Sequence, residues 1–246
     1  MTPTLASIWR HPIKAVGREA MDAATLTAGA TLPGDRLWAV AHEASSAGDD
    51  TWSRCAAFIR AGSSPALMAI EARTEGAIVH LTHPDRSPLA VDPEAEGAAL
   101  VEWLDPLVAD GRARPARIVR APAGHGMTDT SQPTISLGNL TSHRIIAQRL
   151  GRDLSLHRWR CNLWVDGLAP WEEFDLIGRE FRIGAATLRA TERIERCEAT
   201  SANPETGRRD ADLLSVLDAF GHRDFTIALA VVAGGRIAVG DAVTLP

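Results

Sequence analysis

Short apolar segments, separated by clusters of Gly, Pro, Asp and Ser, run through most of the chain, and this spacing constrains the fold more than any other feature. Such segments are typical of β-strands, and the tight glycine turns between them favour a barrel. We therefore predict an α+β fold that is predominantly β, with a few helices. The predicted strands lie at residues 5–11, 22–28, 36–42, 66–72, 77–83, 116–121, 160–167, 180–184, 186–194, 225–234 and 235–245.

Apolar residues recur at helical spacing in two longer stretches. In residues 94–110 they follow the i, i+3/i+4 pattern of one helical face. In residues 137–151 the polar side chain of Asn139 or Thr141 can cap the start of a helix, and a glycine supplies its end. A short third helix is expected near residues 212–220.

A stretch rich in Gly, Pro, Thr and Ser, at residues 121–133, is the best candidate for a domain boundary or a binding loop. The chain has 246 residues, 45% of them hydrophobic, which is enough to build one core or two small ones. We predict a smaller, β-rich N-terminal domain over residues 1–120 and a β-barrel domain over residues 121–246.

Charge and hydropathy disfavour two classes of partner. The 26 basic and 31 acidic residues give a formal net charge of −5, without the basic excess that binding to a phosphate backbone leaves in composition. No apolar run approaches the roughly 20 residues that a membrane-spanning helix needs, and the first residues lack the pattern of a signal peptide. We expect no nucleic acid partner, no membrane span and a cytoplasmic location.

Cysteine usage limits the redox chemistry that the chain can carry alone. The three cysteines, Cys55, Cys161 and Cys197, are odd in number and widely spaced, so a disulfide framework is not expected. An iron–sulfur cluster needs four cysteine ligands, and no CxxC pair is present to begin a zinc site. One-electron chemistry would therefore need a separate donor protein.

Several common site motifs are incomplete or absent. Residues 124–129 supply the first two glycines of a dinucleotide fingerprint, but an aspartate stands where the third is needed. No P-loop, HExxH or GxSxG motif occurs, and pyridoxal phosphate is not expected as a cofactor. His80, His83 and Asp85 suggest a metal site, but a solvated hairpin is the favoured interpretation, because residues three apart on a strand face opposite sides.

Four separated segments combine into a more specific pattern: HPIK at residues 11–14, GDRLW at 34–38, RWRCN at 158–162 and ERCEATSANPETG at 195–207. Together they resemble the MOSC family, named for the C-terminal domain of molybdenum cofactor sulfurase. The resemblance is to the group with an N-terminal MOSC companion domain, which includes the mitochondrial amidoxime-reducing component and its bacterial relatives. It implies a MOSC β-barrel preceded by a smaller β-rich domain.

By this resemblance Cys197 is the catalytic residue and the protein ligand to molybdenum in a molybdenum cofactor, whose pyranopterin dithiolene supplies further sulfur ligands. A thiolate is a soft, strongly donating ligand, so a single cysteine suits that position. Arg196 precedes Cys197, and Arg193 is near in sequence; either guanidinium would favour the thiolate if it pointed toward the sulfur. Arg196 is therefore a candidate cofactor-binding residue.

The cofactor's phosphate needs cations and hydrogen-bond donors, and Lys14, Arg36 and Arg160 match the basic positions of the family motifs. Lys14 is the only lysine in the chain. Thr130 and Ser131 match the DTS segment of the family, where hydroxyls can donate to pterin or phosphate oxygens. The resemblance therefore implies a binding site built from both halves of the chain.

Asn162 matches the asparagine of the family's RFRPN segment and is expected to act through backbone or substrate contacts. The chain departs from the family at Cys161, where a proline is usual, and at Ala15, where the amidoxime reducers have serine. We interpret Cys161 and Cys55 as structural. The departure at position 161 leaves open a second thiol near the site.

Three functions stay open. The leading one is a molybdenum-dependent oxidoreductase that reduces small N-hydroxylated compounds with electrons from a separate ferredoxin-, flavoprotein- or cytochrome-type protein. The second is a sulfur carrier or cofactor-transfer module that uses Cys197 without redox turnover. The third is a non-catalytic barrel in which Cys197 is inert and buried, while Lys14 and Arg36 are surface charges.

Overall fold

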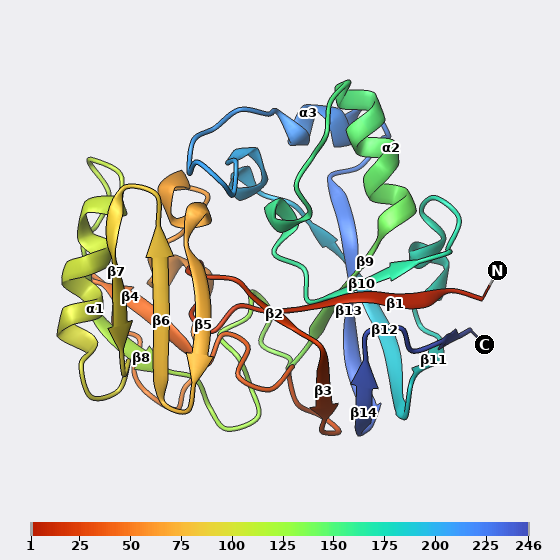
Figure 1. The fold of residues 1–246 in the computed structure, drawn as a ribbon, viewed down its shortest axis with the longest axis horizontal. Coiled ribbons are helices and arrows are strands. Elements are labelled where there is room, and N and C mark those ends of the chain that lie inside the picture. Colours follow the sequence, from red (N-terminus) through yellow and green to blue (C-terminus); the bar gives the residue numbers. More distant parts are fainter. Residues whose placement is uncertain (1, 246) are drawn as a thin grey trace.

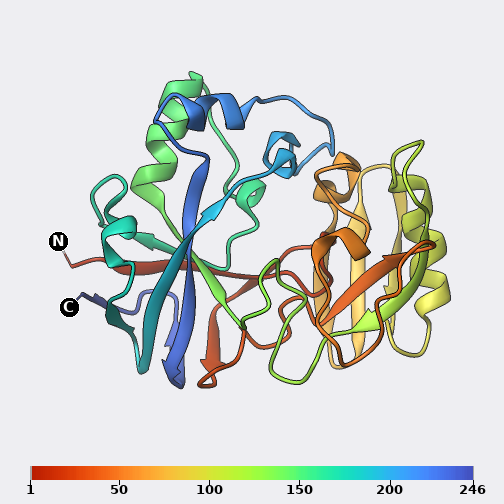
Figure 2. The same cartoon turned by 180° about the vertical axis from the view of Figure 1, so that it is seen from behind.

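A computed structural model describes residues 2–245. Figures 1 and 2 show two bodies side by side, a larger one built on a long sheet and a smaller one that carries helix α1. The helices and helical turns make up little of the chain, which confirms the predicted α+β, predominantly β class. Within residues 2–245, no helix combines the length and apolar character needed to cross a membrane.

The larger body is an eight-stranded sheet in the order β15-β11-β12-β13-β9-β10-β1-β2. Only β9 and β10 pair in parallel within it. Backbone bonds from Leu5 N to Asp241 O (2.9 Å) and from Gly240 N to Leu5 O (2.8 Å) join β1 to the segment leading into β15, so the sheet curls back on itself. The bounds are β15 (Val243–Thr244), β11 (Glu180–Ile183), β12 (Ala186–Glu195), β13 (Asp224–Ala233), β9 (Ile135–Asn139), β10 (Leu163–Asp166), β1 (Thr4–Arg10) and β2 (Glu19–Met21).

A two-stranded sheet, β3 (Ala23–Leu26) with β14 (Gly235–Ala238), packs on the same core, to which it adds Leu26 and Ile237. Strands β1 and β3 therefore come from the first 26 residues but pair with strands of the second half, and β2 extends the large sheet at the free edge of β1. The domain boundary predicted near residue 120 stays a prediction. The pairing shows that the larger sheet is not built from residues 121–246 alone.

The smaller body holds a three-stranded sheet, a separate strand pair and one helix. Apolar residues of α1, Leu100, Trp103 and Leu104, share a core with Val79 and Leu81 of the three-stranded sheet. The elements are β5 (Glu71–Glu75), β6 (Ile78–His83), β7 (Arg86–Val91), the pair β4 (Trp38–His42) and β8 (Pro115–Arg120), and α1 (Gly97–Leu104).

Helices α2 (Leu140–Leu150) and α3 (Leu213–Asp218) lie together at one end of the large sheet (Figure 1). Asn139 caps α2, since its side chain accepts a hydrogen bond from the backbone of Thr141, and Gly151 ends the helix with a φ of +74°. Both signals were predicted. The three residues before Leu140, however, belong to strand β9 and not to the helix.

Three of the predictions for the β-rich segments need correction or refinement. Residues 235–245 do not form one strand, because a turn with Gly240 at a φ of +93° separates β14 (Gly235–Ala238) from β15 (Val243–Thr244). Residues 66–72 do not form one strand: Pro65–Ala69 is a 3₁₀ turn, and β5 begins at Glu71. Pro65 stands in the first turn, and three consecutive apolar side chains are buried there, which an alternating strand does not allow. Near His83 the expected hairpin is confirmed by the β6–β7 pairing, although His83 itself is buried against Ala66 O.

Candidate functional site

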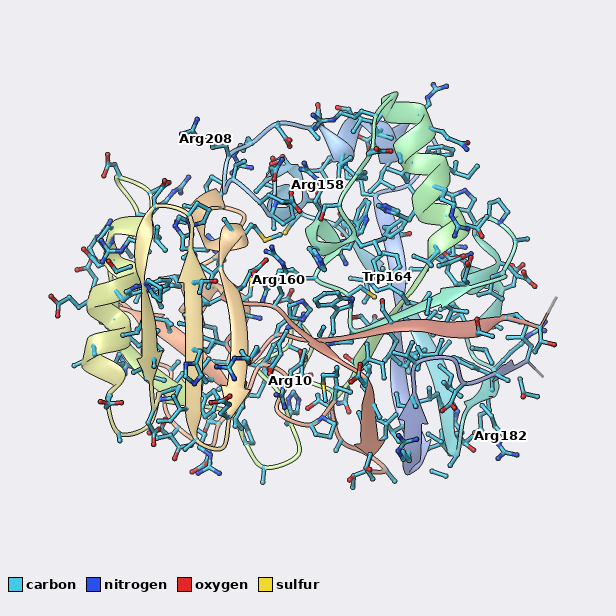
Figure 3. All side chains as sticks on the ribbon, in the orientation of Figure 1. Arg10, Arg158, Arg160, Trp164, Arg182 and Arg208 are labelled. Carbon is cyan, nitrogen blue, oxygen red and sulfur yellow. The ribbon has the colours of Figure 1, made fainter. Side chains whose placement is uncertain are left out.

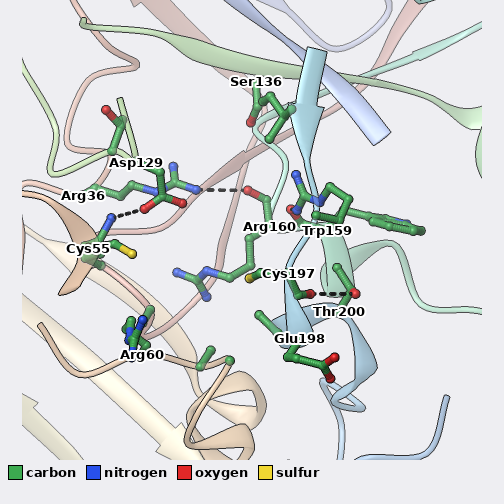
Figure 4. Close-up of a pocket in the computed structure, with 18 of the residues that line it drawn as sticks. Arg36, Cys55, Arg60, Asp129, Ser136, Trp159, Arg160, Cys197, Glu198 and Thr200 are labelled. Atoms are coloured by element: carbon green, nitrogen blue, oxygen red, sulfur yellow. Dashed lines mark hydrogen bonds and ion pairs between the residues drawn. The ribbon is translucent and has the colours of Figure 1, made fainter. Parts of the chain in front are cut away.

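A pocket of about 480 Å³ lies between the two bodies and is lined by residues of both (Figure 4). Its wall is strongly basic, although the whole chain is acidic. A positive pocket in a negative protein attracts anionic ligands. The seven basic lining residues are Lys14, Arg36, Arg60, Arg112, Arg158, Arg160 and Arg196, and the three acidic ones are Asp129, Glu195 and Glu198.

Cys197 lies on this wall, between the end of β12 and the 3₁₀ turn Glu198–Ser201. Its backbone is extended, and its carbonyl accepts hydrogen bonds from Thr200 N (3.1 Å) and Thr200 Oγ1 (3.0 Å). Cys197 is an exposed free cysteine, so its sulfur is available to a ligand in the pocket. The alternative in which Cys197 is an inert cysteine buried in the core is therefore excluded.

Gly62 of the smaller body faces this sulfur. A Cβ added at Gly62 would lie 3.8 Å from Cys197 Sγ and 3.5 Å from Ala199 N. The wall opposite the thiol thus comes within van der Waals range of the sulfur at Gly62, a position that carries no side chain. The thiol is therefore approached from both halves of the molecule.

Three lining residues other than glycine have a left-handed backbone: Ala15 (φ +64°), Arg36 (φ +51°) and Arg160 (φ +47°). Residues with a Cβ rarely adopt this conformation, which costs on the order of 1–2 kcal/mol. Such strained residues cluster at functional sites. Here they coincide with the basic sequence motifs, where the sharp turns direct guanidinium groups into the pocket.

Arg36 is held from both sides. Its guanidinium pairs with Asp35 and also donates from Nη2 to the carbonyl of Arg160 (3.1 Å), which links the two bodies (Figure 4). Asp35 is buried and accepts a hydrogen bond from His11 N (2.8 Å). Burial alone would raise the pKa of Asp35, but the Arg36 charge and the contacts with His11 lower it below its ordinary value. Asp35 is therefore a fixed anion behind Arg36.

Arg160 offers a hydrogen-bond donor that no described residue uses. Its Nη1 donates to Gly17 O (3.2 Å), while Nη2 is buried without a partner within residues 2–245. Burial, followed by the repulsion from Arg36, lowers the pKa of Arg160 to about 9. A buried donor without a partner is costly, and an anion in the pocket would satisfy it.

Lys14 reaches the pocket from the HPIK segment. Its Nζ donates to Met127 O (2.8 Å) and to Asp129 Oδ1 (2.6 Å), which leaves one of its three N–H groups for a ligand. Burial lowers the pKa of Lys14 even though Asp129 opposes the shift. Desolvation at the pocket wall would raise the pKa of Asp129, whose side chain is mostly exposed, but the Lys14 charge lowers it. The lone lysine is thus a buried, paired cation and not a surface charge.

Arg196 is half-buried next to Cys197. Its guanidinium donates to Trp159 O and to Thr226 Oγ1 (3.5 Å), while Nε has no partner among the described residues. Desolvation lowers the pKa of Arg196, whereas the neighbouring Cys197 thiolate would raise it. Arg193 does not share this role, because its guanidinium lies over the Phe174 ring, 4.2 Å from the centroid.

The remaining predicted residues divide into three situations. Thr130 lines the pocket, whereas Ser131 does not and is exposed, with its carbonyl 3.0 Å from His125 Nε2. Asn162 lines the pocket but is buried, and both its oxygen and its nitrogen form hydrogen bonds inside the protein. Its Oδ1 accepts from Ser136 Oγ (2.9 Å), and its Nδ2 donates to Trp9 O (3.0 Å). Asn162 therefore positions strands β1 and β9 beside the pocket.

The two other cysteines differ from each other. Cys161 is buried, and burial raises the pKa of its thiol to about 12, as expected of a structural cysteine. Cys55, also interpreted as structural, lines the pocket instead. Sequence reasoning also missed the lining residues Arg60 and Arg112, which lie in loops without a motif.

The signature segment after Cys197 fastens the two bodies together. Gly207 has a φ of +66°, and a Cβ there would lie 2.7 Å from the Cα of Ala66. Arg209 donates to Gly62 O and to Glu198 O (2.9 Å), so it ties the loop next to the thiol to the opposite wall. The glycine of the PETG segment is required because two backbones meet there.

Comparison with known families supplies the identity of both parts. Residues 127–244 match the MOSC domain, and residues 2–106 match the MOSC N-terminal beta barrel domain. The chain therefore belongs to the MOSC domain family and carries the N-terminal domain, as its motifs predicted. No curated protein matches the sequence.

The solved structures that resemble the chain include the following two. YuaD protein from Bacillus subtilis is 14% identical, with a TM-score of 0.45 over 99% of this chain and 94% of that one. YiiM from Geobacillus stearothermophilus is 18% identical, with a TM-score of 0.38 over 46% of this chain. The match spans about half of the YiiM chain, 53%.

The pocket residues fit the molybdenum cofactor with which the family is associated. Cys197 offers a soft sulfur donor at the wall, and Arg160 Nη2 and Arg196 Nε are buried donors that no residue of the described chain pairs. A phosphorylated pterin supplies the anionic oxygens that such donors need. Chemistry and charge therefore agree with this cofactor.

Proposed function

We propose that the pocket binds a molybdenum cofactor, molybdenum with its pyranopterin dithiolene, and that the protein is a molybdenum-dependent oxidoreductase. The observation that carries the proposal is the exposed Cys197 thiol on a wall whose cations, Lys14, Arg36 and Arg160, come from both halves of the chain. At this wall Arg160 Nη2 and Arg196 Nε are buried without a partner among residues 2–245, which is costly unless an anionic ligand binds them.

The chain's own residues would bind and orient the cofactor. Cys197 would be the metal ligand, and Lys14, Arg36 and Arg160 would hold the phosphate through charge-assisted hydrogen bonds. Thr130 lines the same pocket and offers a hydroxyl to pterin or phosphate oxygens. When bound, the cofactor supplies two-electron oxygen-atom transfer, while the protein provides position and electrostatic environment.

The proposed reaction is reduction of small N-hydroxylated compounds, in which the N–O bond breaks and water is released. It consumes two electrons and two protons. We assign the electrons to a separate ferredoxin-, flavoprotein- or cytochrome-type donor, because three cysteines are too few for a four-cysteine cluster in this chain.

The test is the molybdenum and pterin content of protein purified from a host that makes the cofactor. We expect wild type to hold both. The molybdenum content of Cys197→Ala should be more than about tenfold lower than that of wild type, because a direct ligand is removed. Cys55→Ala is the matched control, since it deletes a second thiol from the same pocket. Equal metal content in wild type and Cys197→Ala would overturn the proposal.

A sulfur carrier or cofactor-transfer module is the second candidate, because an exposed thiol beside cations also suits a persulfide. It predicts sulfane sulfur that cyanide releases from wild type but not from Cys197→Ala. It also predicts no reduction of N-hydroxylated compounds by the loaded protein. Stoichiometric molybdenum together with turnover would exclude this candidate.

A further inference from the structure

The pocket contains more positive charge than the cofactor-binding residues account for. Lys14, Arg36, Arg160 and Arg196 all donate to backbone carbonyls, so their positions are fixed by the protein. Two further arginines on the wall, Arg60 and Arg112, make no side-chain hydrogen bond or ion pair with any residue among 2–245, and both are exposed.

Arg60 and Arg112 come from two neighbouring loops of the smaller body. Ser64 joins these loops, because its Oγ accepts a hydrogen bond from Ala109 N (3.1 Å) and its own N–H donates to Arg60 O (2.9 Å). The guanidinium groups therefore stand on a connected support. In Figure 4, Arg60 lies on the wall opposite Cys197 and Glu198.

This support is also close to the reactive sulfur. Arg60 is two residues before Gly62, the position whose added Cβ would lie 3.8 Å from Cys197 Sγ. Arg60 and Cys197 also line the same pocket, so a ligand held at Cys197 can present a second group to the Arg60 guanidinium. Arginine matches carboxylate and phosphate groups in plane, with two parallel hydrogen bonds.

We propose that Arg60 and Arg112 form a substrate-anion subsite, which selects N-hydroxylated substrates that also carry a carboxylate or phosphate group. This inference rests on the proposed function, because it names the class of substrate for the same pocket. The fixed cations bind the cofactor, and the two unpaired arginines on the opposite wall bind the substrate's anionic group and turn its N–O bond toward Cys197.

The experiment uses a neutral aryl amidoxime and the same amidoxime with a para carboxylate. Calorimetry with molybdenum-loaded protein measures affinity for each, and steady-state kinetics measures KM and kcat. We expect the carboxylated compound to bind about tenfold more tightly than the neutral one, and Arg60→Gln or Arg112→Gln to remove that preference. The preference should also shrink as salt is raised.

Arg182→Gln is the matched control. Arg182 is an exposed arginine on β11 without an ion pair among residues 2–245, and Figure 3 shows it at the right-hand side of the molecule, far from Arg160 near the centre. This variant should keep wild-type preference. Equal affinity of wild type for the two compounds would overturn the subsite, as would equal weakening of both by Arg60→Gln.

Cofactor content separates this inference from its alternatives. Loss of pterin or molybdenum in Arg60→Gln would assign Arg60 to the cofactor, for example to a second phosphate, and would overturn the subsite. If loaded wild type reduces neither compound, the proposed function fails, whereas a carboxylate preference in calorimetry would still support the subsite.

Discussion

At the scale of single residues, the site is organised around buried ionisable groups with fixed protonation states. Asp35 is an anion behind Arg36, and His11 contacts Asp35 through its backbone N–H and its ring. Burial, followed by the charge of Arg160, lowers the pKa of His11 to about 3. His11 is therefore neutral at neutral pH. It adds no further positive charge beside Arg36 and Arg160, which face the pocket.

The lowered pKa of His11 predicts a pH dependence of stability. The unfolded chain protonates this histidine near its ordinary pKa of 6.5, while the folded protein does so only near 3. The stabilisation is complete above pH 6.5 and is lost as the pH falls below it. For this group we expect a loss of about 2 kcal/mol in unfolding free energy between about pH 7 and about pH 5.

Urea unfolding at the two pH values checks this prediction in wild type and His11→Gln. The variant should lose less stability on acidification than wild type does. Parallel pH profiles for wild type and His11→Gln would contradict the prediction.

At the scale of elements, the loop that follows Cys197 is held by close backbone packing. Gly207 meets the Cα of Ala66, and Arg18 donates from its buried guanidinium to Pro204 O (3.0 Å) and Met68 O (3.0 Å). These contacts join residues 203–209 to the 3₁₀ turn of the smaller body. The geometry of the thiol wall therefore depends on the position of this loop.

Gly207→Ala should destabilise the protein more than a Gly→Ala substitution at a glycine that has a positive φ but open space around it. The strained backbone costs about 1 kcal/mol, and displacing the Ala66 backbone adds about 2 kcal/mol. Gly151→Ala is the control, because Gly151 has a similar φ of +74° with open space around it. Urea midpoints measure both, and equal losses would show that the close approach to Ala66 is not energetically important.

How much could be predicted at this scale varied with the type of signal. Asn139 and Gly151 marked the ends of α2 because capping depends on local hydrogen bonds. β7 was missed because it contains Pro88, which is tolerated at the edge of the three-stranded sheet. β9 was partly assigned to the helix because Gly138 lies under the Trp164 ring, a contact that local sequence does not reveal.

The candidate site divided in the same way. Cys197, Lys14, Arg36 and Arg160 lie in motifs, so the sequence was enough to group them. Arg60, Arg112 and Cys55 lie in loops of the smaller body, which reach the pocket only because the two bodies pack together. Ser131, next to a lining residue in sequence, lies outside the pocket wall since the chain turns between Thr130 and Thr134.

At the scale of the whole molecule, the two bodies are interdependent. β1 stands between β10 and β2 in the large sheet, and its Leu5 and Ile8 are fully buried in the larger core. Arg36 joins the bodies across the pocket through the Arg160 carbonyl. Binding residues of both halves are therefore placed by a single folded unit.

This arrangement predicts that residues 121–246 will not fold when produced alone. Without β1 and β2 the edge of β10 and part of the core are exposed, which favours aggregation. We expect this fragment to be insoluble, and to become soluble when residues 1–120 are produced with it. Sedimentation and circular dichroism measure the outcome, and a soluble, folded fragment would contradict it.

The placement of β1 also has a consequence for biosynthesis. Its neighbours β10 and the segment around Asp241 are more than 150 residues further along the chain, so it emerges from the ribosome long before they exist. Until then its apolar face has no native cover, and contacts of such long sequence separation form slowly. Nascent chains of this protein are thus expected to rely on chaperones until translation is nearly complete.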